Sequence, residues 1–384
     1  MGKIKRLVAL LLVTVLFCGT AAADTESDIN EQAEKIFNNY KTTGGTVLVA
    51  KDGEIVYRLN YGWMNKKHQI AVDDDTHFRV ASVTKMVSAI AVMQLVEQGT
   101  LDLDADVSDY LGFSLRNPSS EDTAITLRML MTHTSSIGNK SGERGKTLER
   151  LLGTKSSGHY QKTVPGSTYC YSNLGAGVMG SIIESVTGKN INDAVTESLF
   201  QPLQMDAAYH PSLIQDADSI TNIYGNNRNL KQGAQKLIDE AWDASVDPTT
   251  HYNITVGSLW ITGEDLLRIG MMLCDGGTVD GVRILREETV AEMMADQQGK
   301  GGITAESPYG LCINRNDTLI EGTMVYGHQG ISDAIVANVY YEPESRFVFV
   351  MITNGCKSGM NNRVCAISRK MFTLMWENFG DADE

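Results

Sequence analysis

Hydrophobic and polar residues follow different patterns at the ends and in the middle of the chain. Near both ends, apolar and β-branched residues form short runs typical of strands, at residues 45–51, 54–61, 334–341 and 346–353. Asp52-Gly53 lies between the first two runs and predicts a tight hairpin turn. The last two runs are separated by Glu342-Pro343-Glu344-Ser345, which predicts a second hairpin.

Helical spacing of apolar residues dominates the rest of the chain. It predicts one helix that begins at Ser82 and ends at Gly99. The other segments with this pattern are residues 27–39, 127–131, 175–186, 191–200, 257–275, 287–294 and 361–379. From about residue 101 to residue 242, these segments alternate with Gly/Ser/Asn loops and show few extended signals.

Strand signals at both ends with helices between them predict an α+β fold. We expect one mixed or antiparallel sheet, built from both chain ends and flanked by helices, with an inserted helical subdomain. The α/β lobe would comprise about residues 24–100 and 250–384, and the helical lobe about residues 101–249. A cleft between two lobes is a favoured place for a site.

The first 23 residues have the pattern of a signal peptide. Three basic residues precede an apolar run at 7–17 that is too short to span a bilayer, and Ala21-Ala22-Ala23 forms a small-residue cleavage site. Cys18 leaves a lipoprotein alternative, which the bulky Phe17 disfavours. We expect an exported protein, whether secreted, periplasmic or associated with the cell envelope. No apolar run in residues 24–384 has membrane-spanning length, so we expect no stable span there.

Charge and cysteine content narrow the function classes. The formal charge of −14 falls to −17 when the basic residues Lys3, Lys5 and Arg6 are removed, which argues against nucleic acid as a partner. Neither the cysteines nor the seven histidines have the spacing of a metal site, so we expect no metal and no cofactor. Among the five cysteines after residue 23, Cys356 and Cys365 are the best candidates for a disulfide.

Ser82-Val83-Thr84-Lys85 is the one Ser-x-x-Lys in the chain. Residues three apart on a helix share a face, so the Lys85 amine can reach the Ser82 hydroxyl. A serine hydroxyl needs a nearby base or a positive field to act as a nucleophile, and a desolvated lysine can supply either. Taken alone, Ser82 also suits a plain helix N-cap.

Two further motifs carry candidate chemistry. Tyr171-Ser172-Asn173 follows a Pro-Gly turn signal and precedes a Gly/Ala-rich helix, and His328-Gln329-Gly330 precedes the strand expected at residue 334. Each has a structural alternative, because Tyr171 suits a packed ring and His328 suits a strand-entry loop. A second Tyr-x-Asn, Tyr224-Gly225-Asn226, shows that the triplet by itself is not specific.

Together the motifs resemble the family of active-site serine penicillin-recognising enzymes, which includes class C β-lactamases, D-Ala-D-Ala carboxypeptidases, esterases and D-aminopeptidases. Residues 78–85 resemble its nucleophile segment, and residues 125–136, with Met131-Thr132-His133-Thr134-Ser135, resemble its helix-to-loop signature. The further matches in order and spacing are residues 95–103, 165–188, 322–330 and 341–354. The resemblance covers about residues 30–375 and implies a β-lactamase/transpeptidase-like fold.

The resemblance implies the catalytic roles. Ser82 would attack a carbonyl and become acylated, and Lys85 would share the proton and lower the pKa of its partners. Tyr171 would pass a proton to the leaving group, either as an anionic phenolate or within a Lys–Tyr pair. A phenolate at neutral pH needs cationic neighbours, for which Lys85 and a protonated His328 are the candidates.

It also implies the substrate-binding residues. Asn173 would hydrogen-bond the substrate amide and orient Lys85. His328 stands where many relatives carry the Lys of Lys-Thr-Gly, and Gly330 would let substrate backbone approach the strand edge. The backbone N–H groups of Ser82 and Ile331 would form the oxyanion hole.

The chain departs from the family pattern in two places. Ser136 replaces the Gly usual after Thr-Ser, and Ile331-Ser332-Asp333-Ala334 lacks the Gly often found a few positions after Gly330. His133 is interpreted as a structural loop residue.

These inferences predict an exported, metal-independent serine hydrolase that forms an acyl-enzyme on Ser82. A D-Ala-D-Ala carboxypeptidase acting on cell-wall peptides is favoured, because His-x-Gly occurs in some peptidases and esterases of the family. The alternatives are a class C-like β-lactamase, a short-chain esterase or D-aminopeptidase, and an inactive penicillin-recognising fold used for binding. The partners would be small peptides, D-amino-acid compounds or β-lactams.

Overall fold

A seven-stranded antiparallel sheet forms the centre of the protein in a computed structural model that describes residues 18–139, 146–153 and 158–380, with side chains from residue 26 onwards. Its strand order is β10-β11-β12-β13-β1-β2-β3. The strands are β1 (Gly44–Lys51), β2 (Glu54–Asn65), β3 (Ile70–Ala71), β10 (Asn314–Ile320), β11 (Thr323–Ser332), β12 (Ile335–Glu342) and β13 (Phe347–Thr353). Because β1 pairs with β13, from Gly45 opposite Thr353 to Lys51 opposite Phe347, the two ends of the chain share one sheet, as the sequence predicts.

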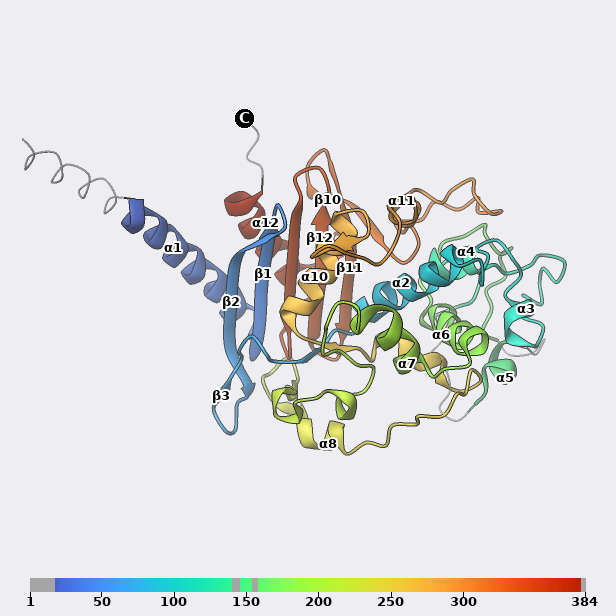
Figure 1. Cartoon of the computed structure of the whole chain (residues 1–384), viewed down its shortest axis with the longest axis horizontal. Helices are drawn as coiled ribbons and strands as arrows, with labels where there is room; N and C mark the ends of the chain where they lie inside the picture. Colours follow the sequence, from blue (N-terminus) through green and yellow to red (C-terminus); the bar gives the residue numbers. More distant parts are fainter. Residues whose placement is uncertain (1–17, 140–145, 154–157, 381–384) are drawn as a thin grey trace, which may run out of the picture.

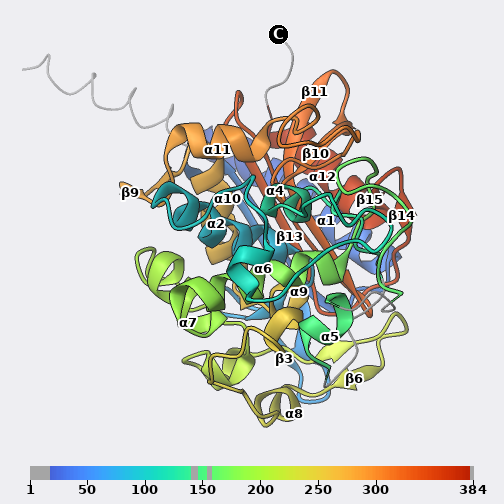
Figure 2. The same cartoon turned by 90° about the vertical axis from the view of Figure 1, so that its right-hand side faces the viewer.

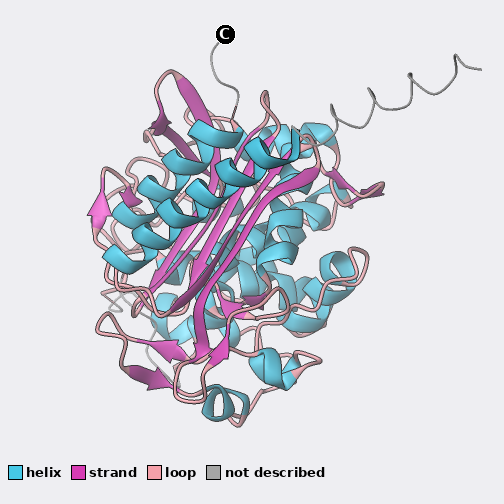
Figure 3. Cartoon of the chain, turned by 90° about the vertical axis from the view of Figure 1, so that its left-hand side faces the viewer, coloured by secondary structure: helices cyan, strands magenta, loops and turns pink. Residues whose placement is uncertain are grey.

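Helices cover both faces of the sheet. Helices α1 (Cys18–Asn39) and α12 (Ala366–Phe379) lie across one face, as Figure 3 shows, and α10 (Gly263–Cys274) packs on the other, with α2 (Val83–Glu97) also on that side. The alternation of side chains along β1 explains this arrangement: Val47 and Val49 pack with α1 and α12, whereas Leu48 and Ala50 face the opposite core. The central strands β1, β12 and β13 are therefore buried on both sides, which accounts for their continuous apolar sequences.

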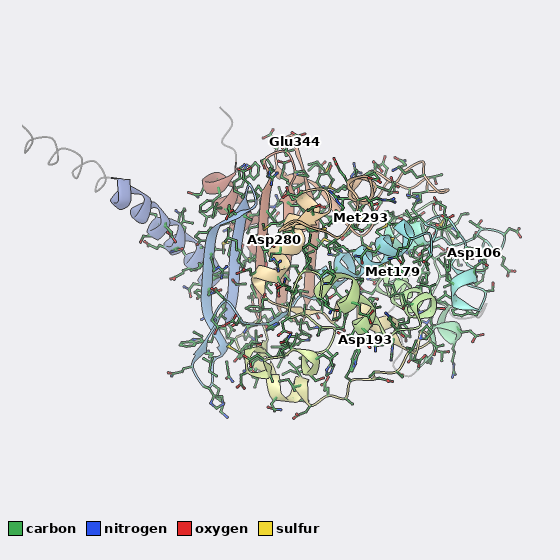
Figure 4. The ribbon with its side chains drawn as sticks, in the orientation of Figure 1. Asp106, Met179, Asp193, Asp280, Met293 and Glu344 are labelled. Carbon is green, nitrogen blue, oxygen red and sulfur yellow. The ribbon has the colours of Figure 1, made fainter. Side chains whose placement is uncertain are left out.

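Most of the other helices gather beyond α2, on the right of Figure 1 and facing the viewer in Figure 2. They are α3 (Ser108–Leu111), α4 (Leu127–Met131), α5 (Leu148–Leu152), α6 (Asn173–Thr187), α7 (Ile191–Val195) with a π-turn at Thr196–Phe200, and α9 (Ile254–Gly257). Helix α8 (Ala234–Ile238) lies apart from them, at the bottom of Figure 1 and on the side of β3. Met179 of α6, labelled in Figure 4, is fully buried, and its sulfur lies 3.8 Å from Cys312 Sγ. Helix α2 contacts both α6 and β11, so its ends join the helical group to the sheet.

Short elements complete the fold. They are β4 (Phe78–Arg79) paired with β7 (Trp260–Ile261), β5 (Ile223–Tyr224) with β6 (Leu230–Gln232), β8 (Thr278–Val279) with β9 (Val282–Arg283), β14 (Met360–Asn361) with β15 (Val364–Cys365), helix α11 (Glu287–Met294), and 3₁₀ turns at Pro211–Leu213, Ala217–Ser219 and His251–Asn253. No helix in the described part of the chain is long and apolar enough to cross a bilayer.

The α+β fold predicted from the sequence is confirmed, but two details were wrong. Strands β10 and β11 were not expected, because β11 is interrupted by two glycines and several polar residues that weaken its strand pattern. The expected disulfide between Cys356 and Cys365 is absent: both are free, buried thiols in the core beneath α12. The predicted signal segment up to residue 17 lies outside the described residues.

Candidate active site

Ser82 lies at the N-terminus of α2, on a turn that is hydrogen-bonded to the segment at Leu259. Just before it, Val80 N–H donates to Leu259 O at 3.0 Å, and Ala81 adopts a left-handed φ of +46°. Such a φ is strained for alanine and turns the chain sharply into the helix. The Ser82 side chain occupies the N-cap position but makes no capping hydrogen bond. Its hydroxyl is therefore free for chemistry, unlike that of an ordinary N-cap serine.

Lys85 lies one turn along α2 with its side chain fully buried. Its Nζ donates to Ser82 Oγ at 2.9 Å and to Val256 O at 2.6 Å. Burial lowers the pKa of Lys85 to about 7, because a charged ammonium is poorly solvated there. Near neutral pH a large share of the amine is therefore neutral and can accept the proton of Ser82.

Tyr171 lies on the other side of the nucleophile. Its hydroxyl is hydrogen-bonded to Ser82, and Lys85 Nζ lies 5.4 Å from the centre of its ring. Burial raises the pKa of the Tyr171 hydroxyl, and the hydrogen bond to Ser82 opposes only part of that rise. Tyr171 therefore remains a neutral phenol at pH 7, which favours the Lys–Tyr pair over the phenolate.

His133 holds the segment that carries Tyr171. Its carbonyl accepts the N–H of Cys170 at 2.8 Å, and its Nδ1 accepts the N–H of Ser172 at 3.3 Å. The His133 and Tyr171 rings lie 4.2 Å apart, and burial keeps the His133 pKa well below its ordinary value. The imidazole is therefore neutral, and His133 holds the backbone on both sides of Tyr171 through its ring and its carbonyl, in agreement with its interpretation as a structural loop residue.

Asn173 begins helix α6, directly after the capping residue Ser172. Ser172 Oγ accepts the N–H of Gly175 at 2.9 Å, which sets the start of the helix. The N–H of Asn173 donates to Asn139 Oδ1 at 3.3 Å, and its own Oδ1 is buried without a hydrogen-bond partner among the described residues. The expected contact between Asn173 and Lys85 is not formed, and the amine donates to Ser82 Oγ and Val256 O. The free Oδ1 is thus an unused acceptor beside Tyr171.

His328 lies inside β11 and is almost fully buried. Its Nδ1 lies 2.8 Å from Gln329 O, and its ring lies 5.5 Å from that of Tyr309. Burial, aided by the charge of Lys85, lowers the pKa of His328 to about 3. This imidazole is therefore neutral at physiological pH, which leaves Lys85 as the remaining one of the two candidate cationic neighbours of Tyr171.

Gly330 brings β11 against the nucleophile turn. A Cβ at this position would lie 2.2 Å from Val80 O and 2.9 Å from Ser82 N, so no side chain fits without moving the strand. Gly330 therefore permits a close approach to the protein's own nucleophile turn. That Gly330 also makes room for substrate backbone stays a prediction.

Ile331 follows on an open strand edge and is 48% exposed. The N–H of its partner Val336 donates to Thr353 Oγ1, on the far side of β12. Because an opposed antiparallel pair turns its N–H groups either toward or away from each other, the N–H of Ile331 faces away from β12. Pairing with β10 ends at Gly327, so this N–H points to the free edge near Ser82. It is well placed to form an oxyanion hole with Ser82 N–H.

The departure at Ser136 also has a physical explanation. Its φ is +63°, a left-handed conformation that glycine adopts without strain. Ser136 is held there because its Oγ accepts a hydrogen bond from Asn117 Nδ2 at 2.9 Å. The substitution therefore keeps the loop conformation.

The site thus combines Ser82, Lys85, Tyr171, His328 and Gly330, which the sequence predicted, with the structural residue His133 and with the buried ring of Tyr309, which the sequence did not indicate. Tyr309 packs against His133 with ring centres 5.1 Å apart. The short resemblance at residues 131–135 was the available signal for His133, whereas nothing in the local sequence marks Tyr309. Within the described part of the chain, no cluster of His, Cys, Asp and Glu side chains is arranged to hold a metal ion.

Known proteins are similar to this chain in sequence and in fold. The model of the Beta-lactamase family matches residues 23–370. Penicillin-binding protein 4 of Amycolatopsis lactamdurans is 28% identical over 333 residues, covering 85% of this chain and 84% of that protein. Esterase EstB of Burkholderia gladioli is 30% identical over 206 residues, a match to 48% of this chain and 51% of the esterase.

A solved class C β-lactamase shares the fold, with a TM-score of 0.71 at 17% identity over 94% of this chain and 98% of that chain. The match to the family model spans the sheet, the nucleophile turn and the segment of Tyr171 in one continuous stretch. The chain therefore belongs to the β-lactamase family and is a serine hydrolase related to penicillin-binding proteins, esterases and class C β-lactamases.

Proposed function

We propose that this serine hydrolase is exported and removes the terminal D-alanine from cell-wall stem peptides through an acyl-enzyme on Ser82. One observation carries the acyl-enzyme chemistry: the Lys85 amine, with its pKa lowered to about 7, lies 2.9 Å from Ser82 Oγ. A base with a pKa close to the working pH is well suited to proton transfer.

The proposed reaction has two halves, acylation of Ser82 and hydrolysis of the acyl-enzyme, and Lys85 and Tyr171 act in both. Neutral Lys85 takes the proton of Ser82 as Oγ attacks the scissile carbonyl, and the N–H groups of Ser82 and Ile331 stabilise the oxyanion. The proton then passes through the Tyr171 phenol to the leaving amine as the C–N bond breaks. In the second half, water gives up a proton to the same pair and attacks the ester, which releases the acid and restores the Ser82 hydroxyl.

The free edge of β11 supports a peptide as substrate. The backbone of Ile331 and the unpaired acceptor Asn173 Oδ1 offer hydrogen bonds to an extended chain added beside the strand. The similarity to a penicillin-binding protein over 85% of this chain supports the same class. A short ester would leave most of this edge unused.

A peptide with a free carboxylate also needs a cation, and the neutral His328 does not supply one. Arg363 is the candidate. Its carbonyl accepts a hydrogen bond from the Gln329 side chain at 2.9 Å, so it lies beside β11, and its charge acts on the Tyr169 hydroxyl. Arg363 also forms an ion pair with Asp317 and is 40% exposed, so it can turn toward a substrate carboxylate.

A short-chain esterase is the second candidate, favoured by the neutral site at His328 and by the similarity to esterase EstB over about half of each chain. An ester substrate requires no carboxylate recognition. Arg363→Gln separates the two candidates, because it should raise KM for a D-Ala-D-Ala peptide and leave the hydrolysis of a neutral ester unchanged.

The test is an intact-mass time course of the protein with a penicillin, with Ser82→Ala as the control. A long-lived adduct on the wild type alone supports a cell-wall peptidase, because acylation then proceeds without deacylation. Penicillin consumption with no lasting adduct identifies a β-lactamase instead. Neither adduct nor consumption rejects the peptidase proposal, and hydrolysis of short esters and D-amino-acid amides then separates an esterase or aminopeptidase from a silent binding fold.

A further inference from the structure

A cavity lies away from Ser82, at the end of the sheet where β2 turns into β3. Its volume is about 630 Å³, within the usual range for pockets that bind small molecules. Three segments form its walls: residues 64–70 of the β2–β3 hairpin, residues 217–224, and residues 228–238 from β6 to α8. None of the residues that we place in catalysis lines it.

Two buried side chains tie these walls together. Tyr224 Oη accepts the N–H of Lys66 at 2.7 Å and a hydrogen bond from Asn222 Nδ2 at 3.1 Å. Asn222 N–H donates to Met64 O at 3.1 Å, and its Oδ1 accepts the N–H of Ala234 at 2.7 Å. The cavity is therefore held open by hydrogen bonds between all three walls, as expected of a preformed site.

The charge of the lining is opposite to that of the protein. Lys66, Lys67 and Arg228 against Asp218 give the lining a formal charge of 3 − 1 = +2 with His68 neutral, whereas the whole chain carries −14. Neither Lys66 nor Lys67 forms an ion pair with a described residue, and both are exposed. These cations are thus available to a ligand.

Arg228 adds an unsatisfied donor. Its Nε is buried and has no hydrogen-bond partner among the described residues, although its guanidinium also contacts the Tyr61 hydroxyl. A buried donor without a partner costs free energy that an incoming acceptor would recover. Because Arg228 is one of the lining residues, an acceptor in the pocket would lie close to this donor.

Apolar side chains complete the lining. Met64 and Ile220 are buried in the wall, while Ile70 is 47% exposed and Leu230 is 53% exposed at the rim. Exposed aliphatic side chains around a cavity favour a ligand with an apolar body. The lining therefore combines a cationic end with an apolar surface.

We infer that this cavity binds a small amphipathic anion, with a carboxylate or phosphate held by Lys66, Lys67 and Arg228 and an apolar body lying against Ile70 and Leu230. This site is separate from the acyl-enzyme chemistry and does not depend on the proposed function. Its occupancy is measured without substrate turnover.

The test uses the fluorescent amphipathic anion 8-anilinonaphthalene-1-sulfonate with the whole protein. Lys66→Glu/Lys67→Glu should raise its Kd by about tenfold or more, because two attractive charges become repulsive. The matched control is Lys35→Glu/Lys370→Glu, which makes the same charge change in the cavity between α1 and α12 and should alter Kd by less than about twofold. Equal Kd values for the wild type and the Lys66/Lys67 variant, or an equal loss in the control, would overturn the inference.

Displacement of the probe identifies the headgroup. Octanoate and octyl phosphate present the same apolar chain with different anions, and 1-octanol presents the chain without a charge. Stronger displacement by either anion than by octanol supports the site and says which headgroup it prefers. If octanol displaces the probe as strongly as the anions do, the site is not an anion site. If none of the three compounds displaces the probe, the inference is likewise rejected. A melting curve of each variant confirms that loss of binding is not loss of folding.

Discussion

The chain contains two Tyr-x-Asn triplets, and their surroundings give them different roles. Tyr171 lies beside a buried amine and the hydroxyl of Ser82, where the mechanism that we propose passes a proton through its own hydroxyl. The Tyr224 hydroxyl instead accepts hydrogen bonds from a backbone N–H and an amide, and joins the walls of a cavity. The comparison teaches that the chemistry belongs to the contacts made by the hydroxyl and not to the triplet.

The largest expected effect comes from removing the nucleophile that makes the Tyr171 site reactive. Ser82→Ala should lower turnover by about 10⁴-fold or more, because no other described group can take up the acyl chain. The measurement is hydrolysis of a chromogenic short ester together with adduct formation by mass. A folded Ser82→Ala protein with wild-type rates would remove the basis of the mechanism.

Replacing each tyrosine by phenylalanine tests the comparison directly. Tyr171→Phe should cost about 10²–10⁴ in kcat, the usual range for a group that transfers a proton. Tyr224→Phe should leave kcat within about twofold and lower the free energy of unfolding by about 1 kcal/mol, since it removes one buried hydrogen-bond acceptor. Similar activity losses in the two variants would contradict the separate roles.

The pH dependence of the rate should follow Lys85. Because only the neutral amine accepts the Ser82 proton, kcat/KM should rise with pH up to about 7 and fall about tenfold for each pH unit below it. Tyr171→Phe retains Lys85 and should keep this rising limb at a lower rate. Lys85→Ala should lose about 10²–10⁴ in rate together with the limb. A wild-type profile that is flat between pH 5 and pH 7 would assign the base elsewhere.

His133 should affect the rate only through the position of Tyr171. His133→Ala should lower kcat by about tenfold with little change in KM, because the Tyr171 segment loses its hydrogen bond at Ser172 N–H. His133→Gln offers a side-chain oxygen to the same N–H and should restore part of the rate. A merely structural loss would lower the melting temperature and would not be rescued in kcat.

The last expected effect is on stability and not on rate. The pKa of Lys85 is lower in the folded protein, about 7, than in the unfolded chain, so the unfolded chain binds the extra proton above pH 7. Between pH 7 and pH 9, the free energy of unfolding of the wild type should therefore rise by about 2 kcal/mol more than that of Lys85→Met. Urea denaturation of both proteins at the two pH values measures this difference. An unchanged difference between the two proteins would show that the amine is not desolvated.

Local sequence pattern was sufficient for elements whose apolar residues point to one core. The hairpin at Asp52-Gly53 and helix α11 lie where the sequence predicts them, because turn residues and apolar spacing act over a few neighbours. Strand β11 could not be found in this way. Its two glycines and buried His328 are stabilised by pairing with β12, which depends on contacts outside the segment.

The site also has contacts that follow from local sequence and contacts that depend on distant segments. Ser82 and Lys85 are close because they lie one helical turn apart, so their contact follows from sequence spacing. The acceptor Val256 O, which takes the second hydrogen bond of Lys85, comes from 171 residues further along the chain. The protonation state of His328 depends likewise on complete burial and not on its neighbours in sequence.

The contact between Gly330 and the turn at Ser82 means that the two backbone donors of the proposed oxyanion hole cannot be adjusted independently. Ser82 N–H and Ile331 N–H come from segments almost 250 residues apart, yet the missing side chain at residue 330 lets one rest on the other. A mutation that shifts β11 therefore also displaces the helix start that carries the nucleophile. Engineering for larger substrates is better directed at the free edge beyond Ile331, which does not rest on the turn at Ser82.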